Sequence, residues 1–213
     1  MLVGGVPPFR TNVPRCHLTP TKYPKTTTDK PCRWWLVSLS FSDYNSRVTQ
    51  PLAPGQPAPA FSLKAIASGR VFRPADHLGR ALLLVFVDHN TGRAAQAIVE
   101  TLRRRYPDHR QLAIALVVDA RVVPRLLRGV AEGIMESSYR EAAAAVPAGF
   151  DAADHLILLP DWSGDVVRAY RIGNVSREIA LVLIGPDGIV QAGYHGPDPA
   201  SRALGLAQSV LGD

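Results

Sequence analysis

Residues 81–96 read ALLLVFVDHNTGRAAQ, and the order of apolar and polar positions in this stretch decides the fold class. The first part, 81–87, is a continuous apolar run of strand length, which is typical of a strand buried on both faces of a sheet. The polar loop Asp88–Thr91 follows it. Beyond this loop, apolar residues recur at helical spacing, at Ala95, Ile98, Val99 and Leu102. A buried strand that leads through a short loop into a helix predicts an α/β protein.

The same alternation continues through the rest of the chain and predicts a sheet that is covered by helices on both faces. Strands are expected within 57–66 and 71–80 and at 81–88, 111–120, 155–161, 179–185 and 189–195, with helices at 92–106, 122–146, 164–172 and 198–212. Strands that alternate with helices pair in parallel. The last two strands are joined by the hairpin turn Pro186-Asp187-Gly188, so the predicted central sheet is mixed.

Residues 1–50 differ in composition from the rest of the chain. They hold 7 of the 24 Lys and Arg residues and 2 of the 18 Asp and Glu residues, a net charge of 7 − 2 = +5, which leaves 17 − 16 = +1 for residues 51–213. We therefore expect one domain at 51–213 behind a basic leader. The leader is either disordered or upstream sequence read in error, with Val48 as the true start. The near-neutral domain argues against binding to nucleic acid.

The cysteines and the apolar segments narrow the class of protein further. Both cysteines, Cys16 and Cys32, lie in the leader, and together with His17 they are too scattered for a tetrahedral zinc site. We expect neither a metal nor another cofactor. The sequence contains no run of about 18 apolar residues, so no membrane span is predicted. The apolar segment 34–41 is too short for a signal peptide and begins too far from the N-terminus. These features predict a cytoplasmic protein that does not bind membranes.

Four motifs, found in the right order between residues 51 and 212, resemble those of a known family. They are PGQPAPAFSL (54–63), HLGRALLLVFV (77–87), LPDWSGDVVRAYRI (159–172) and LVLIGPDGIVQAGYHG (181–196). Together they resemble the thioredoxin-like redoxins, in particular the peroxiredoxin-related alkyl hydroperoxide reductase and thiol-specific antioxidant group. The resemblance implies a thioredoxin-like three-layer sandwich, with a mixed central β-sheet flanked by helices on both faces. It also implies thiol chemistry at the start of the helix that follows residues 81–87.

The residues that would carry this chemistry are absent from the positions that match. The family has C-x-x-C or T-x-x-C there, because the start of a helix stabilises a thiolate and lowers the thiol pKa. In this chain the family's cysteine positions are occupied by Thr91 and Ala94, and residues 51–213 contain no cysteine. A second family position, a cis-proline or an arginine before a later strand, falls on Ile179, with Arg177 two residues earlier.

The loop after residue 87 is still the expected site. The candidate pocket or anion-binding residues are Asp88, His89, Asn90, Thr91, Gly92, Arg93, Arg177 and Ile179. Free N–H groups at the start of a helix suit an anion, although a helix cap by Asn90 or Thr91 explains the same residues more simply. Asp88 and His89 are candidates for an acid–base pair, but adjacent residues at a strand end are expected to point apart. Threonine without a paired base is a weak nucleophile, so an enzyme of different chemistry ranks last.

Two functions remain in competition. The first is a redoxin-like protein that has lost its catalytic thiols and binds a protein partner or a small ligand. The alternative is a thiol-dependent peroxidase or disulfide oxidoreductase that uses Cys16, Cys32 or a partner's thiol. The helical insertion at 122–154 is longer than its family counterpart and predicts either a lid or the surface of a homodimer. One helical face of it is apolar, and Met135 and Tyr139 are expected on its packing side. The apolar face comprises Val122, Val123, Leu126, Leu127, Val130 and Ile134.

Overall fold

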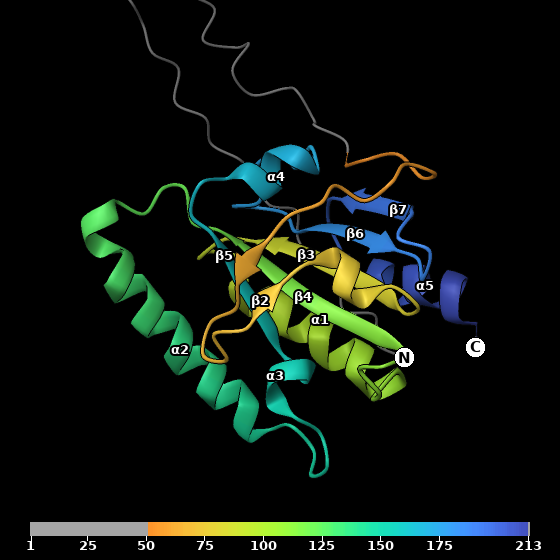
Figure 1. The fold of residues 1–213 in the computed structure, drawn as a ribbon, viewed down its shortest axis with the longest axis horizontal. Helices are drawn as coiled ribbons and strands as arrows, with labels where there is room; N and C mark the ends of the chain where they lie inside the picture. The colour runs from red at the N-terminus through yellow and green to blue at the C-terminus, as the bar shows by residue number, and fades with distance from the viewer. Residues whose placement is uncertain (1–50, 213) are drawn as a thin grey trace, which may run out of the picture. The chain divides into compact units, whose positions relative to one another are not determined.

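The apolar run Ala81–Val87 forms β3, the middle strand of a five-stranded sheet in the computed structural model, which describes residues 51–212 (Figure 1). The strand order is β5-β4-β3-β6-β7. The other strands are β4 (Leu112–Asp119), β5 (Ile157–Asp161), β6 (Ala180–Ile184) and β7 (Val190–His195). Strands β3, β4 and β5 are parallel, whereas β6 is antiparallel to both β3 and β7. The predicted mixed sheet and its final hairpin are therefore confirmed.

Two hydrophobic cores lie on opposite faces of this sheet, because successive side chains of a strand point to opposite sides. Leu84 belongs to the core that the sheet shares with α4, and Val85 belongs to the core that it shares with α1 and α5. Every residue of β3 is buried. The helices are α1 (Gly92–Arg105), α4 (Asp165–Ala169) and α5 (Pro199–Leu211). The protein is thus a three-layer α/β sandwich with helices on both faces of a mixed sheet.

Shorter elements precede and interrupt this alternation. β1 (Leu63–Lys64) and β2 (Val71–Phe72) form a separate two-stranded antiparallel sheet, which confirms the two early strands. The other elements are the 3-10 turns η1 (Pro74–His77) and η2 (Arg125–Leu127) and the helices α2 (Arg128–Ala144) and α3 (Ala152–His155). Helix α3 is not predicted from the sequence, because four residues are too few to show a helical period.

The helix expected at 122–146 is shorter than predicted, and its apolar face is not covered. Pro124 precedes the turn η2, so α2 begins only at Arg128. Met135 and Tyr139 are partly buried, which agrees with the packing side expected for them. The large apolar residues of the opposite side are exposed: Val122, Leu126, Leu127, Val130 and Ile134. Figure 1 shows α2 at the β5 side of the sheet, outside the layers that enclose the two cores.

The part of the chain that the structure describes contains neither a helix that could span a membrane nor a group of side chains that could bind a metal. Between residues 51 and 212 no helix has both the length and the apolar character needed to cross a bilayer. In the same range no group of three or more His, Cys, Asp or Glu side chains could hold a metal ion. The expectations for Val48, for Cys16 and Cys32 and for segment 34–41 lie outside the described residues.

Candidate functional site

The loop after β3 is organised around the buried carboxylate of Asp88. Its Oδ1 accepts hydrogen bonds from the backbone N–H of Asn90 at 2.8 Å and of Thr91 at 3.2 Å. Its Oδ2 accepts one from the hydroxyl of Ser176 at 2.6 Å. The N–H of Gly92 donates to the backbone carbonyl of Asp88 at 3.1 Å. The amides that were expected to be free for an anion are therefore bonded to Asp88, and a bound anion would compete with it.

Thr91 stands at the N-cap of α1, as predicted, but its side chain does not cap the helix. Its Oγ1 accepts from the backbone N–H of Asp88 at 2.9 Å and donates to the carbonyl oxygen of Val175 at 3.1 Å. The hydroxyl is buried, also lies 3.3 Å from Oδ1 of Asp88, and is committed to contacts within the chain. The capping prediction is therefore correct for the position and wrong for the contact, because the carboxylate of Asp88 bonds the amides of Asn90 and Thr91 at the helix start.

Ser176 is the residue that the sequence reasoning missed. It lies in the segment before β6, which the family resemblance placed opposite the active site, but nothing in the sequence distinguishes it from Arg177 or Ile179. The structure brings its hydroxyl onto a carboxylate that is 88 positions away in the chain. Together with the bond from Thr91 to Val175, this contact joins the loop after β3 to the loop before β6.

The electrostatics of Asp88 argue against a role as a catalytic base. Burial raises the pKa of this carboxyl, but hydrogen bonds from Ser176 and from the amides of Asn90 and Thr91, together with the charge of His89, outweigh burial and hold the pKa below its ordinary value of 3.8. An efficient general base has a pKa near the working pH. Asp88 is therefore a strong hydrogen-bond acceptor that stays ionised at neutral pH.

His89 lies closer to Asp88 than the sequence predicts. Its Nδ1 is 3.8 Å from Oδ2 of Asp88, so the two side chains do not point apart. The imidazole is 74% exposed, whereas the side chain of Asp88 is only 7% exposed. A contact at this distance with one partner in solvent is a weak ion pair, which supports no acid–base mechanism.

The outer surface of the loop carries the remaining candidate residues, with one exception. Ile179 is only 2% exposed and packs in the core that the sheet shares with α1 and α5, so the prediction that it lines the pocket is wrong. Its position directly before β6 turns its side chain inward, which a residue count cannot reveal. Arg177 is exposed beside Ser176. The exposed residues of the loop and of the first turn of α1 are His89, Asn90, Arg93 and Ala94.

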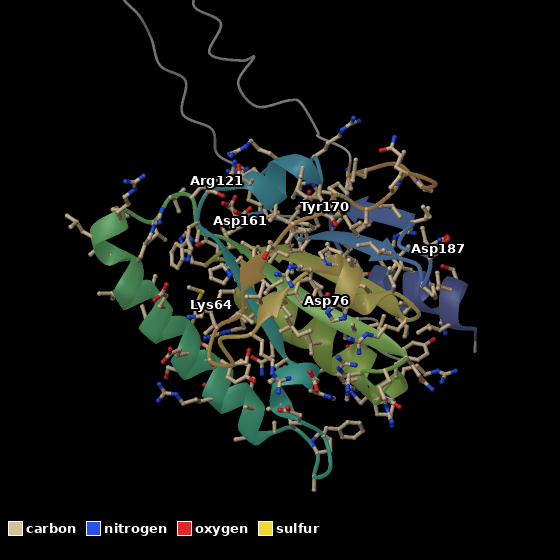
Figure 2. All side chains as sticks on the ribbon, viewed as in Figure 1. Lys64, Asp76, Arg121, Asp161, Tyr170 and Asp187 are labelled. Atoms are coloured by element: carbon tan, nitrogen blue, oxygen red, sulfur yellow. The ribbon has the colours of Figure 1, made fainter. Side chains whose placement is uncertain are left out.

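A second buried carboxylate, Asp161, stands at the end of β5 and caps the neighbouring helix α4. Figure 2 shows it next to Arg121. Its Oδ1 accepts from the backbone N–H of Gly164 at 2.8 Å, and its Oδ2 accepts from Val166 at 2.9 Å and Val167 at 3.0 Å. The motif LPDWSGD therefore serves the fold, because its aspartate satisfies amides at the helix start.

The tryptophan of the same motif holds α2 in place. Trp162 is half-buried, and the guanidinium of Arg128 lies 5.3 Å from the centre of its ring. This geometry is a cation–π contact. Trp162 therefore stacks on the first residue of α2 rather than presenting a free ring to a ligand.

The sheet order, the two helical layers and a loop that leads from β3 into α1 define a thioredoxin-like α/β protein. The fold implied by the sequence motifs is thereby confirmed. No protein-family model matches the sequence, and no curated protein matches it.

Solved structures share this fold at low sequence identity. A putative thiol:disulfide interchange protein DsbE from Chlorobium tepidum is 21% identical, with a TM-score of 0.53, over 76% of this chain and 99% of that one. A putative protein disulfide isomerase from Bacteroides thetaiotaomicron is 14% identical, with a TM-score of 0.53, over 78% of this chain and 95% of that one. The exposed lipoprotein thioredoxin of Streptococcus pneumoniae is 17% identical, with a TM-score of 0.51, over 71% and 99%. At this level of identity the likeness shows the fold.

Proposed function

We propose that this chain is a thioredoxin-fold binding protein without thiol catalysis in its folded domain. One observation carries the proposal: at the start of α1 the two matched positions hold a buried threonine, Thr91, and an exposed alanine, Ala94. The threonine hydroxyl is committed to hydrogen bonds with Asp88 and Val175 within the chain. Neither residue supplies a nucleophile to a substrate.

The exposed part of the same loop supports binding of a negatively charged group. Arg93 and Arg177 are exposed, and neither makes an ion pair with any residue between 51 and 212. The bond from Ser176 to Asp88 holds the segment of Arg177 beside the loop that leads to Arg93. Unpaired guanidinium groups on the first turn of α1 and on the loop before β6 suit a carboxylate or phosphate, which they bind by paired hydrogen bonds.

Thiol-dependent turnover by the full-length protein is expected to equal the buffer blank. The assays are reduction of insulin disulfides with dithiothreitol and reduction of an alkyl hydroperoxide with a thiol donor. The variant Cys16→Ser/Cys32→Ser is expected to give the same result. Turnover that disappears in this variant would establish the alternative enzyme, with its thiol in residues 1–50.

The positive control restores the missing thiols. In the variant Thr91→Cys/Ala94→Cys the helix start is expected to lower a thiol pKa below the ordinary value of about 8.5. Titration of the thiolate absorbance checks this. Two thiols that both titrate near the ordinary value would show that Thr91 and Ala94 do not occupy the catalytic positions of the family.

Anion binding is expected to map to the start of α1, which carries Arg93, and to the loop before β6, which carries Arg177. In a titration with inorganic phosphate followed by NMR, the shifted amides should lie within 89–94 and 176–178. Loss of both guanidinium groups in Arg93→Ala/Arg177→Ala should weaken binding roughly fivefold or more, the equivalent of about 1 kcal/mol. The matched control, which also removes two positive charges, is Arg104→Ala/Arg105→Ala, two exposed arginines near the other end of α1. Equal losses in both variants would mean that phosphate responds only to net charge.

A further inference from the structure

A cleft of about 420 Å³ lies at the end of the central sheet where β3 and β4 begin. Its walls come from five places in the chain: the turn before β3, the end of α1, the turn before β4, the loop after β6 and the end of α5. Three of the residues that line this basic cleft are Arg80, Arg105 and Arg110. None of its lining residues, which all fall within 79–212, is an aspartate or a glutamate.

The arginines of the basic cleft carry more positive charge than the chain neutralises. Arg80 and Arg105 form no ion pair with any carboxylate between residues 51 and 212. The guanidinium of Arg105 stacks on Tyr106 instead, 5.2 Å from the centre of the ring. Arg110 bonds the carboxylate of Asp108, but only through its Nε atom, at 3.1 Å and 3.2 Å from the two oxygens. Three guanidinium groups and one neighbouring carboxylate leave a net charge of 3 − 1 = +2 at the cleft.

The dipole of α1 does not account for this set of cations. Positive charges in the last turn of a helix offset its negative end, and Arg103, Arg104 and Arg105 all stand in that turn. Arg80 and Arg110 lie outside the helices, in the turns before β3 and β4. Cations that line one cleft repel one another, and the helix end gives no reason to add these two. The arrangement therefore favours an anionic ligand.

Hydrogen bonds within the chain hold the walls of the basic cleft together. Tyr106 is only 5% exposed, and its hydroxyl donates to the carbonyl oxygen of Gly212 at 3.1 Å. This bond joins the end of α1 to the end of α5. The backbone N–H of Gly79 donates to the carbonyl oxygen of Pro186 at 2.8 Å, which joins the turn before β3 to the loop after β6. A site whose walls are already ordered loses less entropy when it binds a ligand.

We propose that the basic cleft binds the phosphate group of a small molecule, either free phosphate or a phosphate monoester. Guanidinium groups bind phosphate oxygens by paired hydrogen bonds, and Arg80 and Arg105 have theirs free for this purpose among the described residues. A doubly charged phosphate offsets the whole net charge of the cleft, whereas a single carboxylate offsets half of it. The volume of about 420 Å³ lies in the range of sites for small organic ligands, so the cleft has room for the organic part of an ester.

The basic cleft is separate from the proposed anion site of Arg93 and Arg177 and does not depend on it. The seven residues of β3 lie between the two sites, a span of roughly 20 Å at about 3.3 Å per residue. This distance exceeds the Debye length of about 8 Å at physiological ionic strength, so the exposed charges of one site have little effect on the other. Binding at the two sites can therefore be measured independently.

The first test follows the amides of the basic cleft by NMR while inorganic phosphate is added to the full-length protein. Sodium chloride keeps the ionic strength constant. Amides within 79–81, 105–111 and 211–212 are expected to shift and to saturate together. The variant Arg80→Ala/Arg105→Ala should weaken binding at these amides roughly fivefold or more and leave the response at 89–94 unchanged. Circular dichroism confirms that the variant is folded. The absence of saturable shifts at the cleft of the wild type would overturn the proposal.

The matched control for the basic cleft is Arg93→Ala/Arg177→Ala, which removes two positive charges elsewhere and should leave the affinity at the cleft unchanged. Equal losses at the cleft in this variant and in Arg80→Ala/Arg105→Ala would overturn the proposal, because phosphate would then respond only to net charge. Each site is followed by its own amides, so Arg104→Ala/Arg105→Ala is expected to weaken binding at the cleft and not at 89–94. Loss of binding at 89–94 alone would contradict only the site of Arg93 and Arg177.

The second test compares phenyl phosphate with benzoate, which share a ring and differ in the charge of the anionic group. At about pH 8, above the second phosphate pKa of about 6, phenyl phosphate should bind at the cleft amides at least about fivefold more tightly than benzoate. Equal affinities would contradict the assignment to phosphate. If inorganic phosphate binds and phenyl phosphate does not, the cleft is a site for free phosphate, whereas binding of both extends it to monoesters.

Discussion

Replacement of Asp88 by alanine is expected to lower the free energy of unfolding by about 2–3 kcal/mol. The carboxylate is the common acceptor for the Ser176 hydroxyl and for the amides of Asn90 and Thr91. Its removal leaves these donors without a partner at a partly buried position. Urea denaturation at neutral pH measures the change. A loss below about 0.5 kcal/mol, the size of an ordinary surface effect, would contradict the central role of this carboxylate in the loop.

The variant Asp88→Asn separates the charge of this residue from its shape. The folded-state pKa of Asp88 lies below 3.8, so the carboxylate contributes stability that is fully present above its unfolded pKa and is lost as the pH falls through the folded pKa. The difference in stability between wild type and Asp88→Asn should therefore be largest at neutral pH. It should shrink as the pH is lowered from about 5 towards 2. A difference that does not depend on pH would mean that the ionised form is not favoured by folding.

Replacement of Asp161 by alanine is expected to lower the free energy of unfolding by about 3 kcal/mol. This side chain is 0% exposed and accepts hydrogen bonds from the amides of Gly164, Val166 and Val167. Alanine would leave three buried donors at the start of α4 unsatisfied, and this helix covers one of the two cores. Thermal and urea denaturation should agree on the loss.

The matched control for Asp161 is Asp76→Ala. Asp76, also labelled in Figure 2, has a side chain that is 54% exposed and lies 3.9 Å from Arg73. An exposed pair at this distance contributes little, so a change of less than about 0.5 kcal/mol is expected. If the two variants lose the same stability, the cap at α4 does not have the importance that its buried contacts indicate.

The alternation of strands and helices is readable from the sequence because it depends on local periods. The buried run 81–87, the helix that follows it and the hairpin at Pro186-Asp187-Gly188 all lie where the pattern predicts them. The resemblance to redoxins indicates, in addition, that the site follows the strand at 81–87. Periodicity does not fix where an element begins: α2 begins at Arg128 rather than at residue 122. A proline and a 3-10 turn precede it, and apolar spacing does not distinguish such a turn from a helix.

The site itself divides into local and distant contacts. Asp88, Asn90 and Thr91 are close in sequence, so their membership of one loop is predictable. Their hydrogen-bond partners Ser176 and Val175 are not, because each contact spans more than 80 positions. Sequence reasoning assigned the helix cap to Asn90 or Thr91, whereas the carboxylate of Asp88 bonds the amides of both residues. The choice among such competing donors and acceptors depends on where the backbone places them.

The sequence by itself determined that this protein is an α/β sandwich and that its domain has no cysteine at the start of α1. Both follow from residue identity and from periods of a few residues, which a chain carries before it folds. Only the tertiary structure decided that Ile179 lies in a core, that Ser176 bonds Asp88, and that the apolar face of α2 points outward. The physical reason is that burial and pairing depend on what other segments bring to the same place. A period marks a face as apolar, but packing alone determines whether that face is covered.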